Sequence, residues 1–142
     1  MKSITMKSIL VAYDGSAPAD KAFSLGLDMA AKYGAEVRVL AVSRPPEYGE
    51  DVETEAVIEN SKQHYHDILK PLQPVAEASG VKVHFHVVVG HPAEQIVRHA
   101  DEWKTDMIII GHRGKTLMER WMIGSVAKNV INHAACAVLI TH

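Results

Sequence analysis

The sequence predicts an α/β protein built on an open five-stranded parallel sheet with helices on both faces. Segments with strand and helix patterns alternate along the chain, which begins and ends on a strand. Two strand segments, residues 9–13 and 107–110, are continuously apolar, as is typical of strands covered on both faces. Because parallel neighbours need a long crossover connection, strands that alternate with helices favour a parallel sheet. A length of 142 residues fits one domain, residues 1–142.

The five predicted strands are short runs of mainly β-branched residues. They cover residues 9–13, 37–42, 81–89, 106–110 and 137–140. In the third strand apolar and polar side chains alternate, which indicates a position near an edge of the sheet. His84 and His86 share the polar face and resemble half of a zinc site. No third ligand lies nearby in the sequence, so an exposed edge face is the preferred interpretation.

Helix signals fill the intervals between the strands. Ser16 has the side chain of an N-cap for a first helix, and Gly34 is a suitable residue to end it. A long helical pattern covers residues 55–78, but it contains two prolines, so we expect a kink or break near Lys70. The remaining helices are predicted over residues 92–103 and from the glycine-rich loop described below to residue 133.

Composition and charge exclude several classes of protein. The net charge of −2 gives no basic surface for nucleic acid. No apolar run approaches the roughly 18 residues of a membrane span, so we expect neither nucleic acid nor membrane as a partner. Cys136 is the single cysteine, and the N-terminus lacks a signal-peptide pattern, which together indicate a cytoplasmic protein. Residues 1–5 are predicted to be disordered.

A glycine-rich loop after the fourth strand carries the functional prediction. Its sequence is Gly111-His112-Arg113-Gly114, nine further residues, and then Gly124-Ser125 before an apolar helical pattern. Glycines let a backbone approach a ligand closely, and the first amides of a helix are unpaired and carry partial positive charge. Ser125 has the side chain of an N-cap and can also donate to a phosphate oxygen. The loop is therefore predicted to bind the phosphates of a nucleotide.

Residues at three places in the chain exclude three other kinds of phosphate site. A P-loop has four residues between its glycines, and this loop has two. The turn Asp14-Gly15-Ser16 after the first strand lacks the Gly-x-Gly-x-x-Gly spacing of dinucleotide-binding folds. A response-regulator receiver would have a phosphoacceptor aspartate after the third strand, where this chain has Gly90 and His91. Ligands of open parallel sheets bind beyond the carboxyl ends of strands, so the two loops form one site if the first and fourth strands are neighbours.

Both loops resemble the universal stress protein family, in its ATP-binding subgroup. The pattern Gly-x-x-Gly, nine residues, Gly-Ser resembles that subgroup's signature without a gap or insertion. Residues 11–16 look like the family's first strand and turn, and residues 136–140 look like its last strand. The resemblance extends from Met6 to the end of the chain. It implies a Rossmann-like fold of the adenine nucleotide alpha hydrolase type with strand order 3-2-1-4-5, and a homodimer formed through the last strand, residues 137–140.

The resemblance also implies which residues contact the nucleoside. Ala12 and Val42, at the ends of the first two strands, would contact adenine through backbone groups. Ile110 would pack near the sugar and the base. Asp14 would face the ribose, or a magnesium ion bound with the nucleotide. A magnesium site is implied only in this indirect way.

Further positions are implied to contact the ribose and phosphates. Gly111 and Gly114 would let the loop wrap around the ligand, while Gly124, Ser125 and the amide of Val126 would bind the outer phosphates. The residues between the first two glycines are His112 and Arg113. The family often has a serine where this chain has a histidine, which leaves the local phosphate contacts open.

The predicted function is that of a stress-response regulator or sensor that binds ATP or AMP and acts on an unidentified protein partner. No catalytic residues are predicted, because no general base lies beside a nucleophile in the sequence. Two alternatives remain open at this stage. One is a weak magnesium-dependent ATPase or phosphotransferase, and the other is a dimeric interaction module without a nucleotide.

Overall fold

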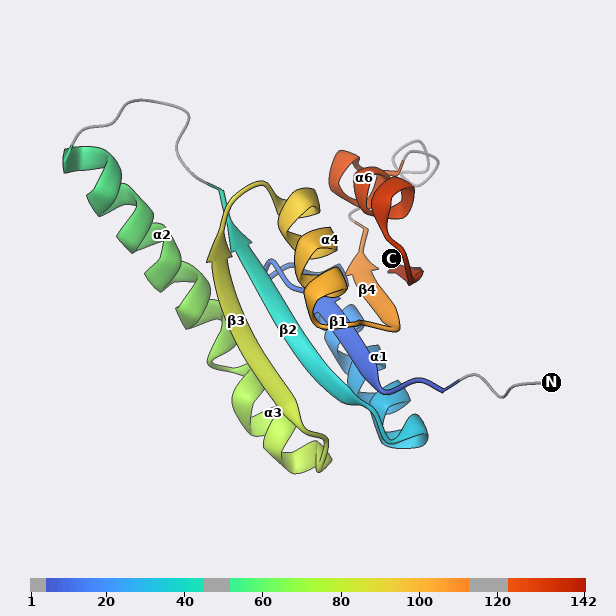
Figure 1. Ribbon diagram of the computed structural model, residues 1–142. Coiled ribbons are helices and arrows are strands. Elements are labelled where there is room, and N and C mark those ends of the chain that lie inside the picture. Colours follow the sequence, from blue (N-terminus) through green and yellow to red (C-terminus); the bar gives the residue numbers. More distant parts are fainter. Residues whose placement is uncertain (1–4, 45–51, 113–122) are drawn as a thin grey trace.

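The structure, a computed structural model, describes residues 5–44, 52–112 and 123–142 (Figure 1). The strands are β1 (Ser8–Ala12), β2 (Glu36–Ser43), β3 (Val83–Val89), β4 (Met107–Gly111) and β5 (Ala137–Thr141). The helices are α1 (Ala17–Tyr33), α2 (Val52–Leu69), α3 (Leu72–Ser79), α4 (Pro92–Glu102) and α6 (Ser125–His133). Residues 1–4, most of the segment predicted to be disordered, lie outside the described residues.

The five strands form one parallel sheet in the order β3-β2-β1-β4-β5, so the predicted fold class and strand order are confirmed. Strand order reverses between β1 and β4, because β2 and β3 extend to one side of β1 while β4 and β5 extend to the other. Ala12 at the end of β1 is the register partner of both Leu40 in β2 and Ile110 in β4. The loops after β1 and β4 therefore start side by side.

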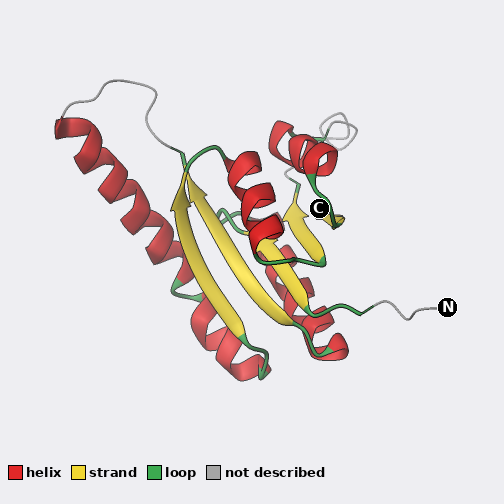
Figure 2. Ribbon diagram, viewed as in Figure 1, coloured by secondary structure: helices red, strands yellow, loops and turns green. Residues whose placement is uncertain are grey.

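Helices cover both faces of the sheet (Figure 2). Alternate side chains of β1 point to opposite faces: Ile9 and Val11 pack with α1, α2 and α3, while Leu10 and Ala12 pack with α4 and α6. Ile9, Leu10 and Val11 are fully buried, which explains the continuous apolar run in the sequence. Burying such a side chain contributes roughly 1.5–3 kcal/mol, so the central strands hold the two helical layers together.

The predicted helix boundaries are largely confirmed. Ser16 caps α1 by accepting a hydrogen bond from the amide of Ala19 at 3.3 Å, and Gly34 ends the helix in the left-handed conformation. The long helical pattern is divided into α2 and α3 at Lys70, as the prolines predicted. Helix α2 begins at Val52, three residues earlier than predicted.

Strand β3 lies at one edge of the sheet, as its alternating pattern predicted. On its polar face the imidazole of His86 stacks against the indole of Trp103, with ring centroids 4.6 Å apart, and the Arg38 guanidinium lies 4.9 Å from the same ring. Burial lowers the pKa of His86, and the neighbouring positive charge of Arg38 lowers it further. His84 lies on the same face, with its Nε2 atom 3.9 Å from a carboxylate oxygen of Glu36. In the described parts of the chain no group of three or more potential metal ligands occurs.

At the opposite edge, β5 pairs with β4, and its other side faces away from the sheet. Cys136, just before this strand, is half-buried and packs against the apolar cluster under α4 and α6. Among the described residues, no helix has the length and apolarity that crossing a membrane requires.

Candidate functional site

A cavity of about 490 Å³ lies at the carboxyl ends of β1, β2 and β4, where the strand order reverses. Eleven residues were predicted to form the nucleotide site, and two of them, Arg113 and Gly114, lie outside the described residues. The other nine all line this cavity: Ala12, Asp14, Val42, Ile110, Gly111, His112, Gly124, Ser125 and Val126. The structure thus brings together residues that are separated by more than a hundred positions in the sequence.

The inner wall of the cavity is apolar. Ala12, Val42 and Ile110 come from three adjacent strands, and each is at least nine-tenths buried. Leu40 and Ile96, which were not predicted, extend this wall from β2 and α4. A flat apolar group such as a heteroaromatic ring is the ligand that such a surface would favour.

Asp14 lies on the exposed rim of the cavity and closes the turn after β1. Its Oδ1 atom accepts hydrogen bonds from the amide of Ser16 at 3.0 Å and from the hydroxyl of Ser16 at 2.5 Å. Gly15 has a φ of +83°, a left-handed conformation that suits glycine. These contacts fix the carboxylate of Asp14 at the start of α1, beside the apolar wall.

Tyr13 also lines the cavity and was not among the predicted site residues. Its side chain is 6% exposed, and its hydroxyl donates a hydrogen bond to Oδ1 of Asp20 at 2.5 Å. Burial raises the pKa of the Tyr13 phenol, and the bond to Asp20 raises it further. The phenol therefore stays protonated at neutral pH and braces the first turn of α1 against the end of β1.

Gly111, which was expected in the loop, is the last residue of β4 and has a packing role besides lining the cavity. It pairs with Thr141, the last residue of β5. A Cβ atom on Gly111 would lie 2.6 Å from the carbonyl carbon of Pro18 and 2.8 Å from the amide nitrogen of Ala19. Glycine is required here because β4 passes so close to the first turn of α1, whether or not a ligand is present.

His112 follows directly and is buried, with 8% of its surface exposed. Its amide donates a hydrogen bond to the carbonyl oxygen of Thr141 at 2.6 Å. The imidazole meets the ring of His142 edge to face, with centroids 5.3 Å apart. The chain leaving β4 is thus held against the C-terminal residues as it enters the cavity wall.

Ser125 was predicted to be the N-cap of the helix after the loop, and this prediction is wrong by one residue. Gly124 is the N-cap, with an extended conformation, and its carbonyl accepts the first helical hydrogen bond from the amide of Lys128 at 2.9 Å. Ser125 is therefore the first residue of α6, and it is exposed. The amides of the first helical residues have no acceptor within the helix, and they lie at the cavity wall.

Two further lining residues matter for the chemistry of the site. Arg44 comes directly after β2, and Tyr65 comes from the C-terminal part of α2. Among the described lining residues, Arg44 is the one lysine or arginine and Asp14 the one carboxylate. The rule that ligands bind beyond strand ends points to Arg44, but no sequence signal shows that α2 brings Tyr65 back to this edge.

Comparisons with known proteins agree with this architecture. The sequence pattern of the universal stress protein family matches residues 5–142. A universal stress protein of Methanocaldococcus jannaschii is 36% identical over 137 residues, which cover 94% of this chain and 81% of that protein.

Solved structures show the same fold. The universal stress protein UspA of Lactobacillus plantarum has a TM-score of 0.87 at 23% identity, with 99% of this chain and all of that chain covered. A universal stress protein crystallised in complex with cAMP has a TM-score of 0.76 at 25% identity. The match covers 98% of this chain and 99% of that chain. With the family pattern matched over nearly its whole length, the chain belongs to the universal stress protein family.

Proposed function

We propose that this protein binds an adenine nucleotide, ATP or AMP, in the cavity at the ends of β1, β2 and β4. The observation that carries the proposal is the convergence of nine predicted residues from four separate segments on one cavity at the switch point of the sheet. This is where open parallel sheets bind their ligands. Occupancy of the cavity is then the signal of a regulator or sensor in the stress response, read by a protein partner.

The chemistry of the cavity supports one orientation of the nucleotide. The apolar wall of Ala12, Val42 and Ile110 suits the adenine ring, and backbone groups at strand ends can pair with its edge. The phosphates lie at the start of α6, near Ser125, where unpaired amides and the helix dipole favour an anion. Asp14, on the rim between them, faces the ribose.

Magnesium fits this site only together with the nucleotide. Asp14 is the single carboxylate among the described lining residues, and its Oδ1 atom already accepts two hydrogen bonds from Ser16. A magnesium ion prefers near-octahedral oxygen coordination and retains several waters, so phosphate oxygens would supply further ligands. Asp14 would then hold the ion from the protein side.

The cAMP complex of a family member supports a nucleotide as the ligand class. The described lining residues include no nucleophile paired with a general base, which favours binding over catalysis. The single cysteine agrees with action in the cytoplasm. Among the described strands β5 lies at an edge of the sheet, which supports a homodimer through residues 137–140. Sedimentation of a monomer at micromolar concentrations would contradict that assembly.

Calorimetric titration with adenosine, AMP and ATP tests the proposed orientation. Ser125→Asp adds a negative charge beside the proposed phosphates at an exposed position where an acidic residue suits the helix dipole. We expect this variant to bind AMP and ATP at least tenfold more weakly than the wild type and to bind adenosine equally well. The matched control Asn132→Asp adds the same charge near the other end of α6 and should bind all three ligands normally. Equal binding of AMP by both variants and the wild type would contradict the placement of the phosphates.

A further inference from the structure

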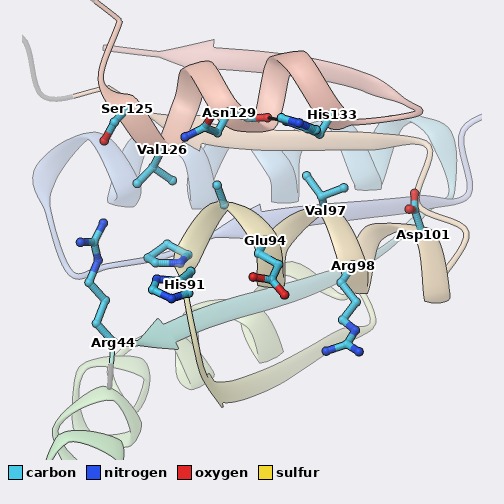
Figure 3. Close-up of a pocket in the computed structure, with 12 residues that line it drawn as sticks. Arg44, His91, Glu94, Val97, Arg98, Asp101, Ser125, Val126, Asn129 and His133 are labelled. Carbon is cyan, nitrogen blue, oxygen red and sulfur yellow. Dashed lines mark hydrogen bonds between the residues drawn. The ribbon is translucent and has the colours of Figure 1, made fainter. Parts of the chain in front are cut away.

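A second cavity, of about 690 Å³, lies between α4 and α6 on the outer side of the helical layer. In Figure 3 it runs as a groove from Arg44 and Ser125 at one end to Asp101 and His133 at the other. Val126 points from α6 toward α4, and Val97 lies on the α4 side. The volume is within the range of about 300–1,000 Å³ found for small-molecule sites, so the groove is large enough for a ligand of its own.

This α4–α6 groove adjoins the nucleotide cavity. Arg44, Pro92, Ser125 and Val126 line both, so the two cavities meet at these four residues. The shared boundary contains the guanidinium of Arg44 and the first residues of α6. Phosphates bound at the start of α6 would therefore lie at the entrance to the groove.

The charges in the groove limit what can extend into it. Beyond the shared boundary the charged lining residues are Arg98, Glu94 and Asp101, which carry a formal sum of −1. A longer chain of phosphates would meet two carboxylates there and is disfavoured. An uncharged group is accepted, because the apolar side chains of Ala93 and Val97 form part of the same wall.

The groove also offers hydrogen-bonding groups suited to a nucleoside. The amide of Asn129 has both donor and acceptor atoms, which can pair with the edge of a base, and it faces the groove in Figure 3. His91 and His133 supply further ring surfaces at the two ends of the groove.

We propose that the α4–α6 groove binds the second nucleoside of a dinucleoside polyphosphate whose first nucleoside occupies the nucleotide cavity. This inference rests on the proposed function, because it needs one adenine nucleotide seated at the ends of the strands. The phosphate bridge crosses the boundary beside Arg44 and the start of α6. The neutral nucleoside then lies between α4 and α6.

Competition binding with AMP, ATP and diadenosine tetraphosphate tests the proposal on the full chain. We expect the wild type to bind diadenosine tetraphosphate at least tenfold more tightly than ATP. Asn129→Trp fills the groove from an exposed position outside the nucleotide cavity. This variant should therefore bind diadenosine tetraphosphate no more tightly than ATP, and its affinity for AMP should be unchanged. The control Lys128→Trp places the same side chain at the neighbouring exposed position, which does not line the groove. This variant should still bind diadenosine tetraphosphate more tightly than ATP.

The outcomes separate this inference from the proposed function. If AMP and ATP bind but diadenosine tetraphosphate binds no more tightly than ATP, the groove proposal is wrong and the proposed function stands. The groove proposal is also wrong if Asn129→Trp keeps the full gain. If none of the three ligands binds to the wild type, both proposals fail together.

Discussion

A Cβ atom on Gly111 would lie 2.6 Å from the carbonyl carbon of Pro18, so the end of β4 and the first turn of α1 are in direct backbone contact. Thr141 strengthens the contact by donating a side-chain hydrogen bond to the carbonyl oxygen of Pro18 at 3.2 Å. Both loops of the candidate site leave from this junction. Its geometry therefore determines how the start of α1 is placed against the end of β4.

We expect Gly111→Ala to destabilise the protein in the absence of any nucleotide. The added methyl group meets backbone atoms that cannot rotate away, and overpacking of this kind costs about 1–3 kcal/mol. Urea denaturation measures the change in unfolding free energy. Gly124→Ala is the control, because a Cβ atom there has no neighbour within 4 Å among the described residues. An equal and small effect of both substitutions would contradict a structural role for Gly111.

We expect the protein to lose stability as the pH falls below the ordinary histidine pKa of about 6.5. Burial and Arg38 lower the pKa of His86, so the unfolded chain binds a proton more readily than the folded one. The stability that neutral His86 contributes to the folded state is fully present above the pKa of this histidine in the unfolded chain. It is lost as the pH falls through the pKa of His86 in the folded chain. Other titratable groups around His86 and Trp103 also change how steeply stability depends on pH. They are Glu36, His84 and His99.

Thermal unfolding of the wild type and of His86→Phe between pH 8 and pH 5 tests this dependence. Phenylalanine keeps a ring against Trp103 but cannot bind a proton, so the loss of stability toward acid should be smaller than in the wild type. His64→Gln changes an exposed histidine on α2 and should retain the slope of the wild type. An unchanged slope in His86→Phe would show that other groups cause the acid sensitivity.

Arg44→Ala should weaken the binding of ATP more than that of adenosine. Arg44 is the one lysine or arginine among the described residues that line the nucleotide cavity, and a hydrogen bond to a charged group contributes about 1.5–3 kcal/mol. A loss of about tenfold or more in ATP affinity follows from that range. Arg98→Ala removes an exposed arginine that lines the α4–α6 groove alone, and it should leave ATP binding unchanged in the same calorimetric titration. Equal losses in the two variants would contradict a local role for Arg44.

The sequence predicted the elements of this fold because local patterns determine them. The apolar run of β1, the cap at Ser16 and the prolines after Lys70 each act within a few residues of chain. The order of the strands came from the family resemblance, since adjacency of β1 and β4 depends on contacts between distant segments.

The site was predictable where it follows strand ends and unpredictable where it depends on packing. Ala12 and Ile110 were implied by the family resemblance, and they lie at strand ends, where open parallel sheets bind ligands. The sequence did not show why residue 111 must be a glycine, because that depends on the close approach of Pro18, which is distant in the sequence. Ser125 was predicted to be the N-cap of α6, but glycine and serine both suit an N-cap position. The backbone conformation shows that the N-cap is Gly124.

Thermal unfolding with and without AMP, ATP with magnesium, and GTP tests the central claim most directly. A ligand that binds only the folded state adds about 2.7 kcal/mol at a hundredfold excess over its dissociation constant. We predict that adenine nucleotides raise the unfolding midpoint of the wild type more than GTP does. Gly124→Val adds a side chain at the cavity wall, where no described atom lies within 4 Å of the Cβ position, and the bulk should abolish most of that rise. An unchanged midpoint of the wild type with every nucleotide would contradict the account.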